Sequence, residues 1–152
     1  MIYLLDTNHC SRIISGDAHI IKELASHQNH QIATSVIVQG ELRFMVEKSE
    51  RQAENLNAVN SFLKEIFLYP ITDSIANVYG ELKGNILRQF GPKAKAQRRR
   101  TTLQELGFSD NDLWIAATVL QHHLALVSAD QDFQRVQSIA SFSLESWLKP
   151  KG

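Results

Sequence analysis

The sequence predicts an α/β fold in which a central, mostly parallel sheet of four to five strands is flanked by helices. Apolar runs at residues 2–5 and 124–128 are typical of buried parallel strands. Segments with apolar residues at helical spacing separate these runs from further candidate strands at 31–34 and 67–71. This alternation indicates a doubly wound sheet, in which ligands bind beyond the carboxyl ends of the strands.

The N-terminal half is expected to contain, in order, a strand at 2–5, helices at 8–14 and 17–27, a strand at 31–34, helices at 35–48 and 50–66, and a strand at 67–71. Ser15-Gly16 can end the first helix, and Asp17 and Ser35 have side-chain oxygens that cap helix N-termini. Pro70 lacks a backbone N–H, which favours an edge position for the last of these strands.

The C-terminal half is expected to contain, in order, a helix at 72–90, a basic polar insertion at about 91–108, a helix at 109–122, a strand at 124–128, a helix at 130–136, and a final edge strand with a tail. Thr72-Asp73 opens the long helix and Gly91-Pro92 ends it. We expect residues 1–152 to form a single domain, because a chain of 152 residues with 43% apolar content can bury one substantial core and is too short for two ordinary domains.

Composition excludes several classes of function. The 16 basic and 16 acidic residues cancel, so the strong positive field of a nonspecific nucleic-acid coat is not expected. Cys10 is the single cysteine and no Cys/His cluster has zinc spacing; His9, His122 and His123 are expected at surface or helix-end positions. No apolar run is long enough to span a bilayer and no basic leader precedes the first strand, so a cytoplasmic protein without membrane contact is expected.

Positive charge is concentrated in one stretch. Between Lys83 and Arg100 there are seven basic residues and no Asp or Glu. A solvated basic loop and a contact with RNA phosphates are both compatible with this pattern. The candidates for contact with RNA or with a partner protein are Arg98, Arg99 and Arg100.

Four carboxylates lie where an acidic side chain is unusual. Asp6 directly follows the first strand, and Asp130 follows the strand at 124–128, although each can also cap the next helix. Asp112 begins a core-facing stripe, but Ser109 to Asp112 also fits a relaxed capping box. Glu41 has only apolar neighbours at three- and four-residue spacing, which are Ile37, Val38, Phe44 and Met45, so it lies either on a buried stripe or at the edge of one.

Together these carboxylates predict a metal site. A parallel sheet of this kind brings the ends of its first and fourth strands together. Helices that flank this edge can bring Glu41 and Asp112 to the same place. Several carboxylates in one pocket repel one another unless a divalent cation compensates. Oxygen ligands without a thiolate point to Mg²⁺ or Mn²⁺, which can activate water for phosphodiester hydrolysis.

Four segments resemble, in order, the motifs of PIN-domain nucleases, and most closely those of VapC-type toxins. They are Leu4-Leu5-Asp6-Thr7-Asn8, Gly40-Glu41-Leu42, the run from Asn111 to Ala117, and the run from Leu126 to Phe133. The resemblance implies a PIN-like fold and a single-stranded-RNA endonuclease with an Mg²⁺- or Mn²⁺-binding acidic centre. It also implies a homodimer that a cognate antitoxin protein holds silent.

The resemblance assigns the acidic set to Asp6, Glu41, Asp112 and Asp130, as catalytic residues and metal ligands. Supporting positions are Thr7, Asn8, Ser128, which stands where the family often has threonine, and Asp132, which competes with Asp130 for the fourth acidic position. The chain departs from the family at about 91–108, where relatives pass faster from the long helix to the Asn-Asp-Leu motif.

Other classes of protein share some of these features. A haloacid-dehalogenase-like phosphotransferase needs a second aspartate two residues after the first, where this chain has Asn8. A phosphoacceptor receiver domain needs a paired acidic residue and a lysine after the last strand, and neither is evident. Within the PIN family, the alternatives are a stand-alone RNA-processing nuclease and a catalytically inactive fold that binds RNA or protein.

Overall fold

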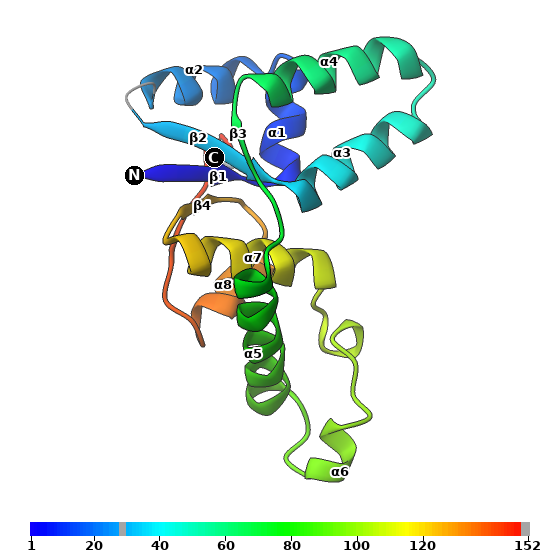
Figure 1. The fold of residues 1–152 in the computed structure, drawn as a ribbon, viewed down its shortest axis with the longest axis vertical. Helices are drawn as coiled ribbons and strands as arrows, with labels where there is room; N and C mark the ends of the chain where they lie inside the picture. Colours follow the sequence, from blue (N-terminus) through cyan, green and yellow to red (C-terminus); the bar gives the residue numbers. More distant parts are fainter. Residues whose placement is uncertain (28–29, 150–152) are drawn as a thin grey trace.

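The computed structural model describes residues 1–27 and 30–149, which form a parallel sheet between two layers of helices (Figure 1). The strands are β1 (Ile2–Leu5), β2 (Gln31–Ser35), β3 (Phe67–Tyr69), β4 (Ala125–Val127) and β5 (Ser143–Glu145). Their order in the sheet is β3-β2-β1-β4-β5, and every neighbouring pair is parallel. The predicted α/β fold is therefore confirmed, with five strands, and Pro70 follows an edge strand as expected.

Helices cover both faces of the sheet. They are α1 (Thr7–Ile14), α2 (Ala18–Ser26), α3 (Val36–Lys48), α4 (Gln52–Lys64), α5 (Asp73–Phe90), α6 (Lys95–Arg98), the 3₁₀ helix η1 (Gln104–Leu106), α7 (Asp110–His122) and α8 (Gln131–Gln137). In Figure 1, α1 to α4 lie on one side of the sheet and α5, α7 and α8 lie on the other. The side chains of Asp17, Ser35 and Thr72 cap α2, α3 and α5 as predicted. No helix among the described residues is long and apolar enough to cross a membrane.

The strand order reverses between β1 and β4. From β1 the chain proceeds outward to β2 and β3, then returns through α5 and α7 to place β4 on the other side of β1. Leu5 pairs with Val127, and the N–H of Asp6 donates to the Val127 carbonyl at 3.1 Å. This register brings the residues that follow β1 and β4 to the same edge, at the switch point where such sheets bind ligands.

Buried apolar side chains fix the position of these strand ends. Leu4, Leu5, Leu126 and Val127 are fully buried. Burial of a side chain of this size stabilises the fold by about 1.5–3 kcal/mol. The hydroxyl of Thr34 on β2 donates to the Leu5 carbonyl at 2.7 Å, so the last residue of β1 is held from both neighbouring strands.

The insertion at 91–108 is anchored to the core, although its sequence is mostly polar. Leu103 and Phe108 are buried, at 1% and 3% exposure. Gly107 adopts a left-handed conformation with φ of 81°, which turns the chain from η1 into Phe108. The guanidinium of Arg135 on α8 lies 3.9 Å from the centre of the Phe108 ring and donates to the Leu106 carbonyl at 2.8 Å. Figure 1 shows α6 beyond the end of α5, away from the sheet.

Candidate active site

A pocket of about 370 Å³ lies at the carboxyl ends of β1 and β4. Its polar lining comes from separate parts of the chain and consists of Asp6, Thr7, Asn8, Glu41, Asp112 and Asp130. The structure therefore brings the four predicted acidic residues to one place. Apolar side chains of α7 and α8, Ile115 and Phe133, form part of its wall.

Asp6 is held in place by the first turn of α1. Its side chain is 11% exposed, and its Oδ1 accepts hydrogen bonds from the backbone N–H of His9 at 2.9 Å and from His9 Nδ1 at 2.8 Å. Asp6 is thus both the N-cap of α1 and a lining residue of the pocket. Because both hydrogen bonds with described residues end on Oδ1, the other carboxylate oxygen remains available as a ligand.

Glu41 lies at the edge of the buried face of α3, which is one of the two placements that the sequence left open. Of its apolar neighbours, Phe44 and Met45 are 61% and 42% exposed. The buried residues of α3 are Val38, Leu42 and Val46. The Glu41 carboxylate accepts a hydrogen bond from the Thr7 hydroxyl at 2.9 Å, which orients it across the pocket from α3 towards α1.

Asp112 is the electrostatic centre of the pocket. The Ser109 hydroxyl caps α7 by accepting a hydrogen bond from the backbone N–H of Asp112 at 3.1 Å. Burial raises the pKa of the Asp112 carboxyl to about 7, and nearby negative charges add to this effect; in decreasing order they are Asp130, Glu41, Asp132 and Asp6. Burial and the neighbouring carboxylates thus act in the same direction, and both disfavour a negative charge on Asp112.

The segment after β4 offers two acidic side chains. Asp130 lines the pocket and caps α8 by accepting the N–H of Asp132 at 2.9 Å, while its own N–H donates to the buried Ser128 hydroxyl at 3.1 Å. Asp132 lies 3.5 Å from the Arg135 guanidinium. Ligand oxygens of Asp112, Asp130 and Asp132 all lie within 4.8 Å of one another, so this cluster could hold a metal ion.

His9 lies in the first turn of α1, which agrees with the expected helix-end position, but its side chain is buried and not at the surface. It is fully buried, and its Nε2 accepts the backbone N–H of Trp147 at 3.1 Å. The spacing from Asp6 was the available signal, because a side chain three residues after a helix cap can reach back to it. His122 and His123 do lie at the end of α7.

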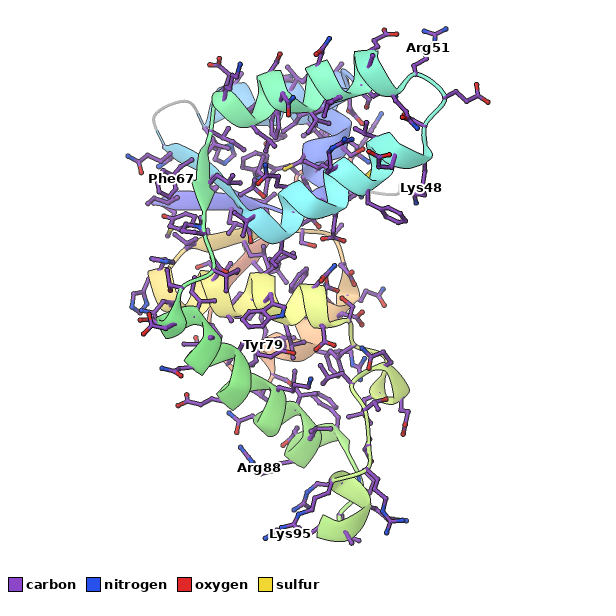
Figure 2. The ribbon with its side chains drawn as sticks, turned by 45° about the vertical axis from the view of Figure 1, so that its right-hand side comes forward. Lys48, Arg51, Phe67, Tyr79, Arg88 and Lys95 are labelled. Carbon is purple, nitrogen blue, oxygen red and sulfur yellow. The ribbon has the colours of Figure 1, made fainter. Side chains whose placement is uncertain are left out.

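Asp110 is a second residue that the sequence did not single out. Its carboxylate accepts hydrogen bonds from the Tyr79 hydroxyl at 2.6 Å, from Gln104 at 3.2 Å and from Lys83 at 3.3 Å. The Tyr79 hydrogen bond is the largest cause that lowers the pKa of Asp110. The Tyr79 ring, labelled in Figure 2, stacks on Trp114 at 3.7 Å, so Asp110 joins α5, η1 and α7.

The basic residues lie apart from the pocket. We define the basic tip as Arg88, Lys93, Lys95, Arg98, Arg99 and Arg100. Figure 2 shows Arg88 and Lys95 at the end of the molecule remote from the sheet. The Arg98 guanidinium donates to the carbonyls of Lys93 at 2.7 Å and Pro92 at 3.4 Å, and thereby closes the turn before α6, whereas Arg99 and Arg100 are exposed.

A doubly wound α/β fold with an oxygen-rich acidic pocket at its switch point defines a class of proteins that can hold a hard divalent cation there. The model of the PIN domain family matches residues 3–139, and the chain belongs to this family. The family expected from the sequence motifs is therefore confirmed.

Three similar proteins extend this result. The chain is 29% identical over 154 residues to Ribonuclease VapC2 of Rickettsia felis (strain ATCC VR-1525 / URRWXCal2), with 98% of this chain and 100% of that protein covered. It is similar to the crystal structure of VapBC2 from Rickettsia felis bound to a DNA fragment from their promoter, with a TM-score of 0.76, 26% identity, and coverage of 97% and 100% of the two chains. DNA-bound VapBC from Salmonella typhimurium shares the fold, with a TM-score of 0.78, 21% identity, and coverage of 97% and 99%.

Proposed function

We propose that this chain is a divalent-metal-dependent endoribonuclease that hydrolyses phosphodiester bonds in single-stranded RNA, and that it is the toxin of a toxin–antitoxin pair. The observation that carries this proposal is the convergence of Asp6, Glu41, Asp112 and Asp130 on one pocket. The raised pKa of Asp112 supports it, because burial and, to a smaller extent, the neighbouring carboxylates disfavour its negative charge, and a cation in the pocket would compensate that charge as a proton does. The name of the relative, a ribonuclease, supports the choice of RNA.

The donor set fits Mg²⁺ or Mn²⁺. The polar lining offers carboxylate, hydroxyl and amide oxygens, and these are the ligands that hard cations prefer. Asp112 would hold the ion together with Asp130 or Asp132, whose oxygens lie close to it, and Asp6, which lines the same pocket, would complete the set. When bound, such an ion activates water and stabilises the negative charge that develops on the phosphate.

The remaining lining residues act on the substrate and on one another. Glu41, oriented by the Thr7 hydroxyl, positions the attacking water or takes part in a second ion site. Asn8 is exposed at the pocket and can contact the phosphate with its amide. Ser128 fixes the start of the loop that carries Asp130.

Binding of RNA needs positive charge, which the pocket itself does not supply. Since the lining side chains are acidic, neutral polar or apolar, a bound ion would be the source of positive charge inside the pocket, and basic side chains elsewhere on the chain would add to the affinity for a polyanion. We propose that the exposed Arg99 and Arg100 of the basic tip contact RNA phosphates, and that Arg98 shapes the tip through its bonds to Pro92 and Lys93.

We propose an antitoxin partner and a homodimer on the basis of the VapBC complexes whose toxin fold this chain shares. Co-purification with the product of a neighbouring short reading frame, and the mass of the chain in solution, test these two points. A single domain over residues 1–152 and a cytoplasmic location stay predictions from the sequence.

A cleavage assay tests the proposed activity. The purified chain is incubated with mixed single-stranded RNA and Mn²⁺ or Mg²⁺, with and without EDTA, and the assay is repeated with Asp6→Asn. We expect cleavage that EDTA abolishes and that the variant lacks, while its far-UV circular dichroism is retained. Cleavage that survives both changes would refute the proposal.

A further inference from the structure

His9 lies directly behind the acidic pocket. The side chain is fully buried in the first turn of α1 and does not line the pocket itself. Its ring contacts Asp6 on one side and Trp147, 138 residues after His9, on the other: Nδ1 lies 2.8 Å from Asp6 Oδ1, and Nε2 lies 3.1 Å from the backbone nitrogen of Trp147.

The contact with Trp147 determines which ring nitrogen of His9 carries the proton, and therefore how the ring interacts with Asp6. A backbone N–H can only donate, so Nε2 of His9 must accept from Trp147 and carries no proton. The proton of the ring is then on Nδ1, where it is directed at Asp6 Oδ1. That oxygen consequently receives two N–H donors from one residue, the ring and the backbone of His9.

Trp147 is itself firmly held. It is 3% exposed, its ring stacks on His27 with centroids 4.5 Å apart, and its indole N–H donates to Glu145 Oε1 at 3.2 Å. A continuous set of contacts therefore leads from the residues after β5 through His9 to the first acidic residue of the pocket.

We propose that His9 is a positioning residue that orients the Asp6 carboxylate for metal binding, with Trp147 selecting the tautomer that makes this possible. The inference rests on the proposed function, because it concerns the ion that Asp6 would bind. Partners that orient a metal ligand commonly change metal affinity by about 10–100-fold when they are lost. A histidine that serves folding alone would leave the affinity of the folded protein unchanged.

Two variants separate the two contacts. His9→Asn places an amide nitrogen near the position of Nδ1 and can still donate to Asp6, but it is too short to reach Trp147. His9→Gln places an amide oxygen near the position of Nε2 and can still accept from Trp147, but it loses the donor to Asp6. The pair is matched, since each variant keeps one hydrogen bond and loses the other.

The affinity of the full chain for Mn²⁺ is measured without RNA, from the electron paramagnetic resonance signal of the free ion. Thermal unfolding in EDTA measures the stability of each variant. We expect His9→Asn to bind Mn²⁺ within about threefold of wild type and His9→Gln to bind about 10–100-fold more weakly. Equal affinities in the two variants, or losses that follow their melting temperatures, would overturn the positioning role.

A measurement on the unmodified protein covers the case in which a variant does not fold. Two-dimensional ¹H–¹⁵N spectra of the imidazole ring should show a protonated Nδ1 and an unprotonated Nε2 for His9. A protonated Nε2 would overturn the inference. Absence of Mn²⁺ binding by the wild-type chain would instead overturn the proposed metal centre, and the inference with it.

Discussion

The acidic pocket and the basic tip are built in opposite ways. The pocket takes its carboxylates from the end of β1, from α3, from α7 and from the loop after β4, each fixed by a cap or a buried strand. The basic tip is one nearly continuous stretch between Arg88 and Arg100, exposed at the far end of α5 (Figure 2). Chemistry that needs fixed distances is distributed over the sheet, whereas attraction of a polyanion needs only exposed charge.

The largest expected effect is the loss of cleavage in Asp112→Asn. This change removes the central carboxylate of the pocket, a proposed ligand of the ion, and should lower the RNA cleavage rate by at least about 10²-fold, because even the loss of a group that only supports a metal ligand commonly costs about 10–100-fold. The same variant should melt at a higher temperature in EDTA, because it removes repulsion among the acidic side chains.

Asp110→Asn is the matched control, since it lies two residues earlier on α7 and binds Tyr79 rather than lining the pocket. It should cleave RNA at close to the wild-type rate and melt at a lower temperature. Equal loss of cleavage in Asp112→Asn and Asp110→Asn would contradict the claim that the carboxylates of the pocket, and not those beside it, are required for cleavage.

The second effect is a dependence of stability on pH in EDTA. The pKa of Asp112 rises from 3.8 to about 7 on folding, so between these pH values the folded state holds more protons than the unfolded state. The free energy of unfolding should therefore fall as pH rises through this window. As pH rises through this window, differential scanning calorimetry should show the melting temperature of wild type falling by several degrees more than that of Asp112→Asn. Addition of Mn²⁺ at pH 8 should raise the melting temperature of wild type again. Parallel pH profiles would contradict this role of Asp112.

The third effect concerns the basic tip. In the double variant Arg99→Ala/Arg100→Ala, the slope of log affinity against log salt for single-stranded RNA should fall in magnitude by about 1.4, because each lost phosphate contact contributes about 0.7. Arg51→Ala/Lys64→Ala removes the same charge from exposed positions elsewhere and should change the slope less. If the salt slopes of the two double variants are equal, the basic tip has no special part in RNA binding. The affinity of both variants for the antitoxin then tests whether the tip contacts that partner instead.

The smallest effect is expected for Tyr79→Phe. It keeps the stack on Trp114 but loses the hydroxyl bond to Asp110, which should lower the free energy of unfolding by about 1 kcal/mol in urea titrations. Cleavage should not change. Tyr3→Phe is the control, because the Tyr3 hydroxyl has no hydrogen bond with the described residues, and it should be close to neutral.

Most of the fold was predictable because its signals are local. Buried runs such as Leu4-Leu5 mark strands, and Asp17, Ser35 and Thr72 mark helix starts, within a few residues of where the structure places them. The insertion at 91–108 was harder to interpret, since the burial of Phe108 depends on Phe90 and Arg135, which are distant in sequence. Its polar composition gave no sign of these partners.

The candidate site was predictable in its membership and less so in its surroundings. Acidic residues at strand ends and helix starts indicated that Asp6, Asp112 and Asp130 would meet, and the pocket contains them; their catalytic roles stay predictions. The exposure of Phe44 was not predictable, because periodicity alone did not decide whether Glu41 and its apolar neighbours lie on the buried stripe of the helix or at its edge. The helix-end position of His9 was predictable, but its burial was not, because its partner Trp147 is brought to it only by the complete sheet.

The anchoring of the insertion separates a stretch that tolerates changes in length from one that does not. Leu103 and Phe108 are buried against the body, while residues 92–102 form a loop between the end of α5 and these two anchors. Lengthening or shortening such a loop leaves the strand ends undisturbed. We therefore expect changes in the length of residues 92–102 to spare the acidic pocket, and substitutions of Leu103 or Phe108 to disturb the packing of the body.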